Sequence, residues 1–207
     1  MSQSDKDKEI STKQELQPGS IIEEVKTNNS GEVKFIKYYI RRLLGKGACS
    51  KCYECTRLED NINFALKVIP KKSLINSKRK KNLEMEIKIQ KSLHHPKIIK
   101  IEHYFQDSKN VYLLLELVHN QTLFELLNRR KRLTELEVQC YIVQLIKVMK
   151  YLHNNRIIHR DLNLTNLFLT DKMELKVGDF SISSKLDFEG ERKNSICGLQ
   201  IILLQKY

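Results

Sequence analysis

The sequence has 207 residues, a formal net charge of +12 at pH 7, 41% hydrophobic residues, 7 Gly and 3 Pro. This length and composition fit one globular domain of ordinary size and exclude collagen-like and wholly disordered chains. The apolar runs are short, as at 201–204, and stay far below the roughly 20 residues that cross a bilayer, so we expect no membrane partner.

The N-terminal part of the sequence is polar. Its first ten residues, MSQSDKDKEI, are charged and lack an apolar core, so no secretory signal is visible and we expect an intracellular location, cytoplasm and/or nucleus. Residues 1–36 show no sustained periodicity, which favours a disordered N-terminal extension.

From residue 38 onward the chain reads as short β-rich segments separated by turns. We expect strands at 38–44, 51–57, 64–69, 98–105 and 111–117. A helix is expected at about 80–93, and Pro96 stops it.

The second half is helical. Thr134 and Glu137 have the spacing of a capping box, in which each side chain satisfies a free amide of the first helical turn. Apolar residues then recur at helical spacing and predict one core-facing stripe: Val138, Tyr141, Ile142, Leu145, Val148, Met149 and Leu152. Short apolar pieces at 167–169 and 175–177 predict a small hairpin.

The cysteines allow more than one interpretation. The chain has 5 Cys, an odd number that fits reduced thiols better than a disulfide framework. Cys49, Cys52 and Cys55 have a spacing found in metal sites. Residues three apart on a strand face opposite sides, however, and no fourth ligand follows nearby, so we favour structural cysteines.

Three chemical signals occur in the first half, in a fixed order. Gly45 and Gly47 lie between two expected strands, where a glycine turn can bring backbone amides to phosphate oxygens, although an ordinary hairpin turn is the alternative. Lys67 lies inside an apolar strand and needs an anionic partner. Glu86 on the expected helix supplies one, with Glu84 as the alternative.

A fourth signal follows in the second half. His159-Arg160-Asp161 begins a polar loop that reaches Asn166, and Asp179 stands in a later Gly-Asp-Phe-Ser sequence. Two Asp and one Asn supply hard oxygen ligands for magnesium and a base for a hydroxyl proton.

The order of these signals resembles the signature set of eukaryotic protein kinases, over about residues 38–198. Four segments make the likeness strongest to the polo-like Ser/Thr kinases: GKGACSKCYE, FALKVIPKKSL, LEMEIKIQKSLHHPKII and GERKNSICG. The resemblance implies a two-lobed α+β fold. It places a kinase domain at 37–198, with a β-rich small lobe carrying one main helix at 37–118, an incomplete helical large lobe at 119–198 and an unmatched tail at 199–207.

The resemblance also implies roles. ATP and Mg²⁺ would be the cofactors, and protein Ser or Thr hydroxyls the acceptors. Asp161 would accept the hydroxyl proton, Lys67 would hold the α- and β-phosphates under the orienting effect of Glu86, and Asn166 and Asp179 would hold the metal. The other implied nucleotide contacts are Leu44, Gly45, Gly47, Cys52, Ala65, Leu115, Glu116, Val118 and Phe168. Ser195 matches a regulatory phosphosite that Arg160 would bind.

Some residues depart from the family pattern. Asn163 stands where Ser/Thr kinases carry a lysine that neutralises the transferring phosphate, and Ser181 replaces a glycine. After Gly198 neither a Thr-Pro-x-Tyr segment nor an Ala-Pro-Glu motif follows, so we expect a shortened kinase. A catalytically poor pseudokinase or fragment, acting as an ATP-binding or protein-interaction module, is the alternative.

The basic excess also allows a nucleic-acid binder. That interpretation rests on charge alone, because runs such as 78–81 and 129–132 are typical of solvated surface. We therefore expect no nucleic-acid partner.

Overall fold

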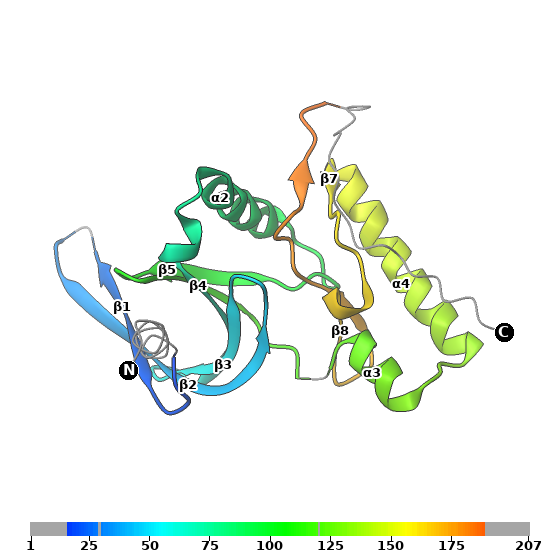
Figure 1. Cartoon of the computed structure of the whole chain (residues 1–207), viewed down its shortest axis with the longest axis horizontal. Coiled ribbons are helices and arrows are strands. Elements are labelled where there is room, and N and C mark those ends of the chain that lie inside the picture. Colours follow the sequence, from blue (N-terminus) through cyan, green and yellow to red (C-terminus); the bar gives the residue numbers. More distant parts are fainter. Residues whose placement is uncertain (1–15, 29, 120, 189–207) are drawn as a thin grey trace, which may run out of the picture.

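The computed structural model describes residues 16–28, 30–119 and 121–188. Its largest element is a six-stranded antiparallel sheet with the strand order β1-β2-β3-β4-β6-β5, which forms a small lobe (Figure 1). The strands are β1 (Ile21–Thr27), β2 (Val33–Lys46), β3 (Lys51–Arg57), β4 (Ile62–Pro70), β5 (Ile101–Gln106) and β6 (Asn110–Glu116).

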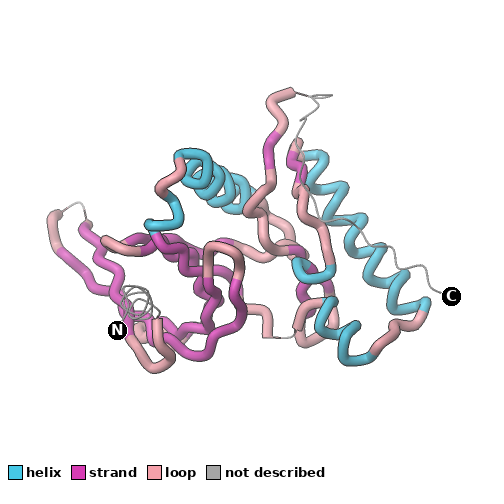
Figure 2. Tube along the Cα trace, in the orientation of Figure 1, coloured by secondary structure: helices cyan, strands magenta, loops and turns pink. Residues whose placement is uncertain are grey.

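Helices complete the two lobes. A short 3-10 turn, η2 (Lys71–Leu74), and the helix α2 (Ser77–Ser92) accompany the sheet. The large lobe contains α3 (Leu123–Arg130), α4 (Glu135–Asn154), β7 (Ile157–Ile158), η3 (Leu164–Asn166), β8 (Leu167–Leu169), β9 (Leu175–Val177) and β10 (Ser184–Lys185). Figure 2 shows the long strands gathered in one half and α3 and α4 in the other, which confirms the predicted two-lobed α+β fold.

Each lobe contains a hydrophobic cluster, and a third, smaller cluster of Ile69, Leu83 and Leu113 joins the sheet to α2. The small-lobe cluster includes three aromatic rings in a row, because Tyr38 stacks on Phe105 at 5.3 Å between centroids and Phe105 on Tyr112 at 4.8 Å. The large-lobe cluster includes Ile89 and Leu93 from the end of α2. The end of α2 therefore packs into the large lobe, which fixes this helix between the two halves.

The expected disordered extension over 1–36 is wrong for residues 21–27 and 33–36, which form strands. β1 pairs with the first half of β2, with Ile22 opposite Tyr38 and Glu24 opposite Ile36. Ile22 and Ile36 are buried, but so is Glu24, at 4% exposure. A carboxylate at an inward position breaks the apolar alternation that identifies a strand. The small lobe thus begins before residue 37, and residues 1–15 lie outside the described part.

Helix α3 is a feature that the sequence analysis missed. Its N-terminus carries a complete capping box, in which Thr122 Oγ1 accepts from the Glu125 N–H and the Glu125 carboxylate accepts from the Thr122 N–H. The same device at Thr134 and Glu137 opens α4, as predicted. The spacing at Thr122 is therefore the signal that could have located α3.

The strand predicted at 98–105 begins later, at Ile101. Ile98 and Ile99 leave the sheet to contact β9 of the large lobe, where the Ile99 N–H donates to the Val177 carbonyl at 2.9 Å. The hairpin predicted at 167–169 and 175–177 is confirmed as β8 and β9.

The predicted core stripe of α4 is only partly buried. Tyr141, Val148 and Leu152 are buried, whereas Val138 and Ile142 are 44% and 48% exposed. Within the described residues α4 contacts mainly β7 and β9. None of the described helices is long and apolar enough to span a membrane.

Candidate functional site

The glycine turn joins β2 to β3. Gly45 pairs with Cys52 across the hairpin, and the Gly47 N–H donates to the Ser50 carbonyl at 2.8 Å. The loop from Gly47 to Ser50 forms one wall of a cavity of about 350 Å³. Its lining includes Lys67, Glu86 and Asp179. The turn thus lies beside the charged residues that the sequence singled out.

Lys67 lines this cavity. It lies on β4 between Cys52 of β3 and Leu113 of β6. Its Nζ is 2.6 Å from Glu86 Oε1 and 3.3 Å from Asp179 Oδ1. Burial acts to lower the pKa of Lys67, but the two carboxylates outweigh it and hold that pKa above its usual value. The ammonium therefore stays charged.

The choice between the two candidate glutamates is settled by the face of α2 on which each lies. Glu86 is buried together with Leu83 and Ile89, whereas Glu84 is exposed. Burial raises the pKa of Glu86, and Lys67 opposes that shift. Glu86 is thus the partner of Lys67, as favoured from the sequence.

Asp161 lies in the loop after β7 with both carboxylate oxygens engaged. Asn163 Nδ2 donates to Oδ1 at 3.1 Å, and Asn166 Nδ2 donates to Oδ2 at 2.9 Å. Two amides therefore fix the carboxylate in one orientation.

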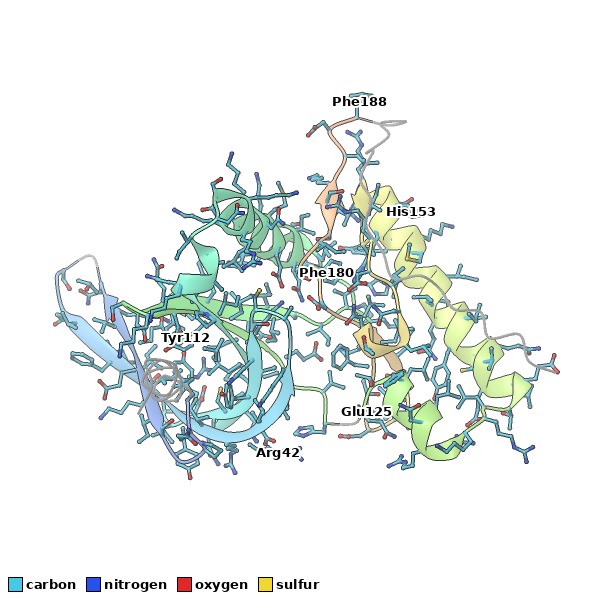
Figure 3. The ribbon with its side chains drawn as sticks, in the orientation of Figure 1. Arg42, Tyr112, Glu125, His153, Phe180 and Phe188 are labelled. Carbon is cyan, nitrogen blue, oxygen red and sulfur yellow. The ribbon has the colours of Figure 1, made fainter. Side chains whose placement is uncertain are left out.

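His159 is a residue to which the sequence analysis gave no role. Its Nδ1 accepts from the Asp161 N–H at 3.3 Å and its Nε2 donates to the Gly178 carbonyl at 3.0 Å, which assigns the neutral imidazole with its proton on Nε2. Burial lowers the pKa of His159. Figure 3 labels Phe180 between the two lobes. The Phe180 and His159 rings pack edge to face, with 4.6 Å between their centroids. His159 thus ties the Asp161 loop to the Asp179 segment.

Asp179 has a φ of 56°, a left-handed conformation that is uncommon for a side chain other than glycine. Its Oδ1 accepts from Lys67 and from the Ser181 N–H, both at 3.3 Å. Burial acts to raise the pKa of Asp179, but Lys67 and Ser181 outweigh it and lower that pKa. Ser181 is absent from the residues with positive φ, so the serine fits this backbone without strain.

Close packing brings Asp179 to the site. At Gly178 a Cβ would lie 2.9 Å from both Ile99 and Phe168, so this position has no room for a side chain. The Gly178 N–H donates to the Asn166 carbonyl at 3.0 Å, which holds Asn166 beside Asp179.

Asn166 and Asp179 have the donor atoms that a magnesium ion takes. Asn166 Nδ2 is used by Asp161, and no donor among the described residues reaches Asn166 Oδ1. The Asp179 side chain is 39% exposed and open to a ligand. Two oxygen donors suit Mg²⁺, which keeps several waters and is bound through one or two protein groups. The described residues contain no cluster of three or more metal-ligating side chains.

Of the other implied nucleotide contacts, Gly47 lines the 350 Å³ cavity and the rest do not. Ala65 pairs with Leu115, and Cys52 lies between Gly45 and Lys67. Leu44 is on β2, Glu116 ends β6, Val118 follows it and Phe168 is on β8. The structure therefore places these residues on the sheet, just after it and on β8.

One contact near this set was not predicted. The Glu116 carboxylate pairs with Lys176 Nζ of β9 at 2.5 Å, and the Glu116 N–H donates to the Lys100 carbonyl at 2.9 Å. The segment that connects the lobes is thus tied to the large lobe by an ion pair.

The predicted phosphosite Ser195 lies outside the described residues. Its implied partner Arg160 has a φ of 69° and donates from Nε to the Ile182 carbonyl at 2.5 Å. Arg160 therefore contacts the segment that follows Phe180.

Comparison with known proteins agrees with this geometry. The family description "Protein kinase domain" matches residues 38–200. The chain belongs to the protein kinase family. Its similarity to polo-like members supports a polo-like protein kinase catalytic domain.

Three relatives illustrate the similarity. A probable serine/threonine-protein kinase CCRP1 of Zea mays is 54% identical over 180 residues, which cover 86% of this chain and 29% of the relative. The serine/threonine-protein kinase polo of Drosophila melanogaster is 47% identical over 161 residues, 78% of this chain and 28% of the relative. The probable serine/threonine-protein kinase PLK of Dictyostelium discoideum is 45% identical over 183 residues, which cover 88% of this chain and 18% of the relative. This kinase chain thus spans less than a third of each of these relatives.

Proposed function

We propose that the chain is an ATP-dependent protein serine/threonine kinase of polo-like type. The observation that carries the proposal is the position of Lys67 Nζ, 2.6 Å from Glu86 and 3.3 Å from Asp179, beside a cavity that the glycine turn lines. A buried lysine held by two carboxylates beside a glycine turn is the arrangement that positions a nucleoside triphosphate. The names of the relatives support the same class.

The reaction follows from the placement of the side chains. The acceptor Ser or Thr oxygen forms a bond to the γ-phosphorus as the bond from that phosphorus to the ADP oxygen breaks, and the hydroxyl proton goes to the Asp161 carboxylate. Two amides hold that carboxylate, so it meets the hydroxyl in one orientation. Lys67 neutralises phosphate charge, and Glu86 fixes the direction of its amine.

A magnesium ion would be held by Asn166 Oδ1 and the Asp179 carboxylate. When bound, it supplies positive charge to the phosphate oxygens. The acceptors would be protein Ser and Thr hydroxyls, as for the kinases that the chain resembles.

Nucleotide binding is tested first. Isothermal titration with ATP should give a magnesium-dependent binding signal that Lys67→Met removes. Lys72→Met, a change at an exposed lysine of η2, serves as the matched control and should bind like the wild type. A wild type that binds no nucleotide at millimolar ATP contradicts the proposed site.

One observation favours a second candidate, a nucleotide-binding pseudokinase. Asn163 is neutral and its amide is used by Asp161, so this position offers no cation to the transferring phosphate. Phosphate transfer to casein that disappears in Asp161→Asn excludes this candidate. Magnesium-dependent ATP binding without any transfer supports it.

A further inference from the structure

Asn163 uses its whole side-chain amide inside the loop. Its Nδ2 donates to the Asp161 carbonyl at 3.2 Å and to Asp161 Oδ1 at 3.1 Å. Its Oδ1 accepts from the Thr165 N–H at 2.9 Å and from the Thr165 hydroxyl at 2.5 Å. The amide thus bridges Asp161 on one side and Thr165 on the other.

Thr165 determines which way this amide points. The Thr165 N–H can only donate, so it requires the oxygen of the Asn163 amide, and the Thr165 hydroxyl donates to the same oxygen. A flipped amide would place Nδ2 against the Thr165 N–H and Oδ1 against the Asp161 carbonyl and carboxylate oxygens. The Thr165 N–H therefore fixes Nδ2 toward Asp161, and the Thr165 hydroxyl adds a second hydrogen bond to the same oxygen.

The same contacts also shape the backbone of the loop. Asn163 is the N-cap of η3, and its carbonyl accepts from the Asn166 N–H at 3.0 Å. Asn166 in turn donates to the second oxygen of Asp161 at 2.9 Å. Asn163 thereby acts on Asp161 directly and through the placement of Asn166.

We propose that Asn163 and Thr165 form a positioning pair that orients the Asp161 carboxylate for the acceptor hydroxyl. The inference rests on the proposed kinase function and deepens it. In this interpretation the neutral Asn163 holds the Asp161 carboxylate, and Thr165 holds the Asn163 amide in the orientation that this requires. Neither side chain is assigned a contact with the nucleotide.

A positioning role predicts a specific kinetic change. Loss of the Thr165 hydroxyl removes one of the two hydrogen bonds to Asn163 Oδ1, so the amide is held less firmly and Asp161 spends less time in its productive orientation. The turnover number should fall by about tenfold while the KM for ATP stays within about twofold, because the pair does not touch the nucleotide. A merely structural defect would instead change both constants or the folded fraction.

The experiment uses the full chain and five variants. Thr165→Val removes the hydroxyl, and Thr165→Ser keeps it and should restore the turnover number. Asn163→Ala removes the amide, and adding Thr165→Val to it should cause no further loss, because both changes break one unit. Thr170→Val, which removes a hydroxyl that accepts from the Glu174 N–H in the β8–β9 hairpin, should leave turnover unchanged.

Hydrogen exchange of the Asn163 side-chain amide, followed by NMR, decides the inference independently of catalysis. We expect slow exchange in the wild type and Thr165→Ser, and exchange at least fivefold faster in Thr165→Val. A wild type that binds Mg²⁺ and ATP but transfers no phosphate contradicts the proposed function, and the exchange rates alone then test the pair. Equal exchange rates in the wild type and Thr165→Val overturn the inference.

Discussion

Glu24 and His103 are joined at 2.7 Å between Oε1 and Nε2, although their strands β1 and β5 lie at opposite ends of the hydrogen-bonded order of the sheet. The sheet therefore curls until its two edges meet. The Tyr38 hydroxyl, which lies inside the curled sheet, donates to Glu24 Oε2 at 2.9 Å. The buried carboxylate is thus fully partnered, which allows it to occupy an inward position of β1.

Removal of this carboxylate should destabilise the small lobe. Glu24→Ala leaves the Tyr38 hydroxyl without its acceptor, and we expect the free energy of unfolding to fall by about 1–3 kcal/mol in urea denaturation. Glu23→Ala is the matched control, because Glu23 is exposed and its ion pair with Lys37 is a surface contact. Equal stability of the two variants contradicts a structural role for Glu24.

Replacement of the Lys67 partner should weaken catalysis without unfolding the chain. Glu86→Gln removes the charge that fixes the Lys67 ammonium, so we expect kcat/KM for ATP to fall by about 10- to 100-fold. Glu84→Gln, two residues earlier on the exposed side of α2, should have little effect. Steady-state kinetics with varied ATP compare the two, and equal losses would exclude the assigned pairing.

The cap of α4 should give a measurable pH dependence. Hydrogen bonds lower the pKa of Glu137 from 4.5 to about 2. The bond from Arg130 has the largest effect, and the bonds from the Thr134 N–H and hydroxyl add to it. A depressed carboxyl pKa stabilises the fold above the unfolded value, and this contribution disappears as the pH falls from 4.5 toward 2. Glu137→Gln should therefore melt below the wild type at pH 6 and level with it near pH 2.

Glu135→Gln, also in the first turn of α4, is the control for this comparison and should show a smaller difference at pH 6. A Glu137→Gln difference that persists unchanged to pH 2 argues against the ionised cap.

The described cysteines should react in a fixed order. Burial raises the pKa of Cys52 to about 11 and that of Cys55 to about 12, so both remain thiols at neutral pH. Cys49 and Cys140 are exposed. Mass spectrometry after iodoacetamide at pH 8 should show Cys49 and Cys140 modified at least about tenfold faster than Cys52. Alkylation of Cys52 at the rate of Cys49 contradicts the burial of Cys52.

The sequence predicted those residues of the site whose charge or metal-binding oxygen atoms indicate a chemical role. A lysine in an apolar strand requires an anionic partner, and Glu86 is that partner of Lys67 in the structure. Asp161, Asn166 and Asp179 were predicted from their order, and hydrogen bonds around Gly178 bring their loops together.

Other contacts could not be predicted, because they depend on backbone geometry. No spacing rule places Glu24 against His103, since the contact exists only after the sheet has curled. The amide of Asn163 was recognised as a missing charge, but its bridge from Asp161 to Thr165 requires the turn at η3. Helix α3 differs from these cases, because its capping box was visible in the sequence.

Phosphate transfer tests the central claim most directly. Purified chain, radiolabelled ATP and magnesium are incubated with casein, and Asp161→Asn is run beside the wild type. The account predicts labelled casein with the wild type and a loss of at least about a hundredfold with Asp161→Asn. Absence of transfer by the wild type, or equal transfer by both proteins, would contradict it.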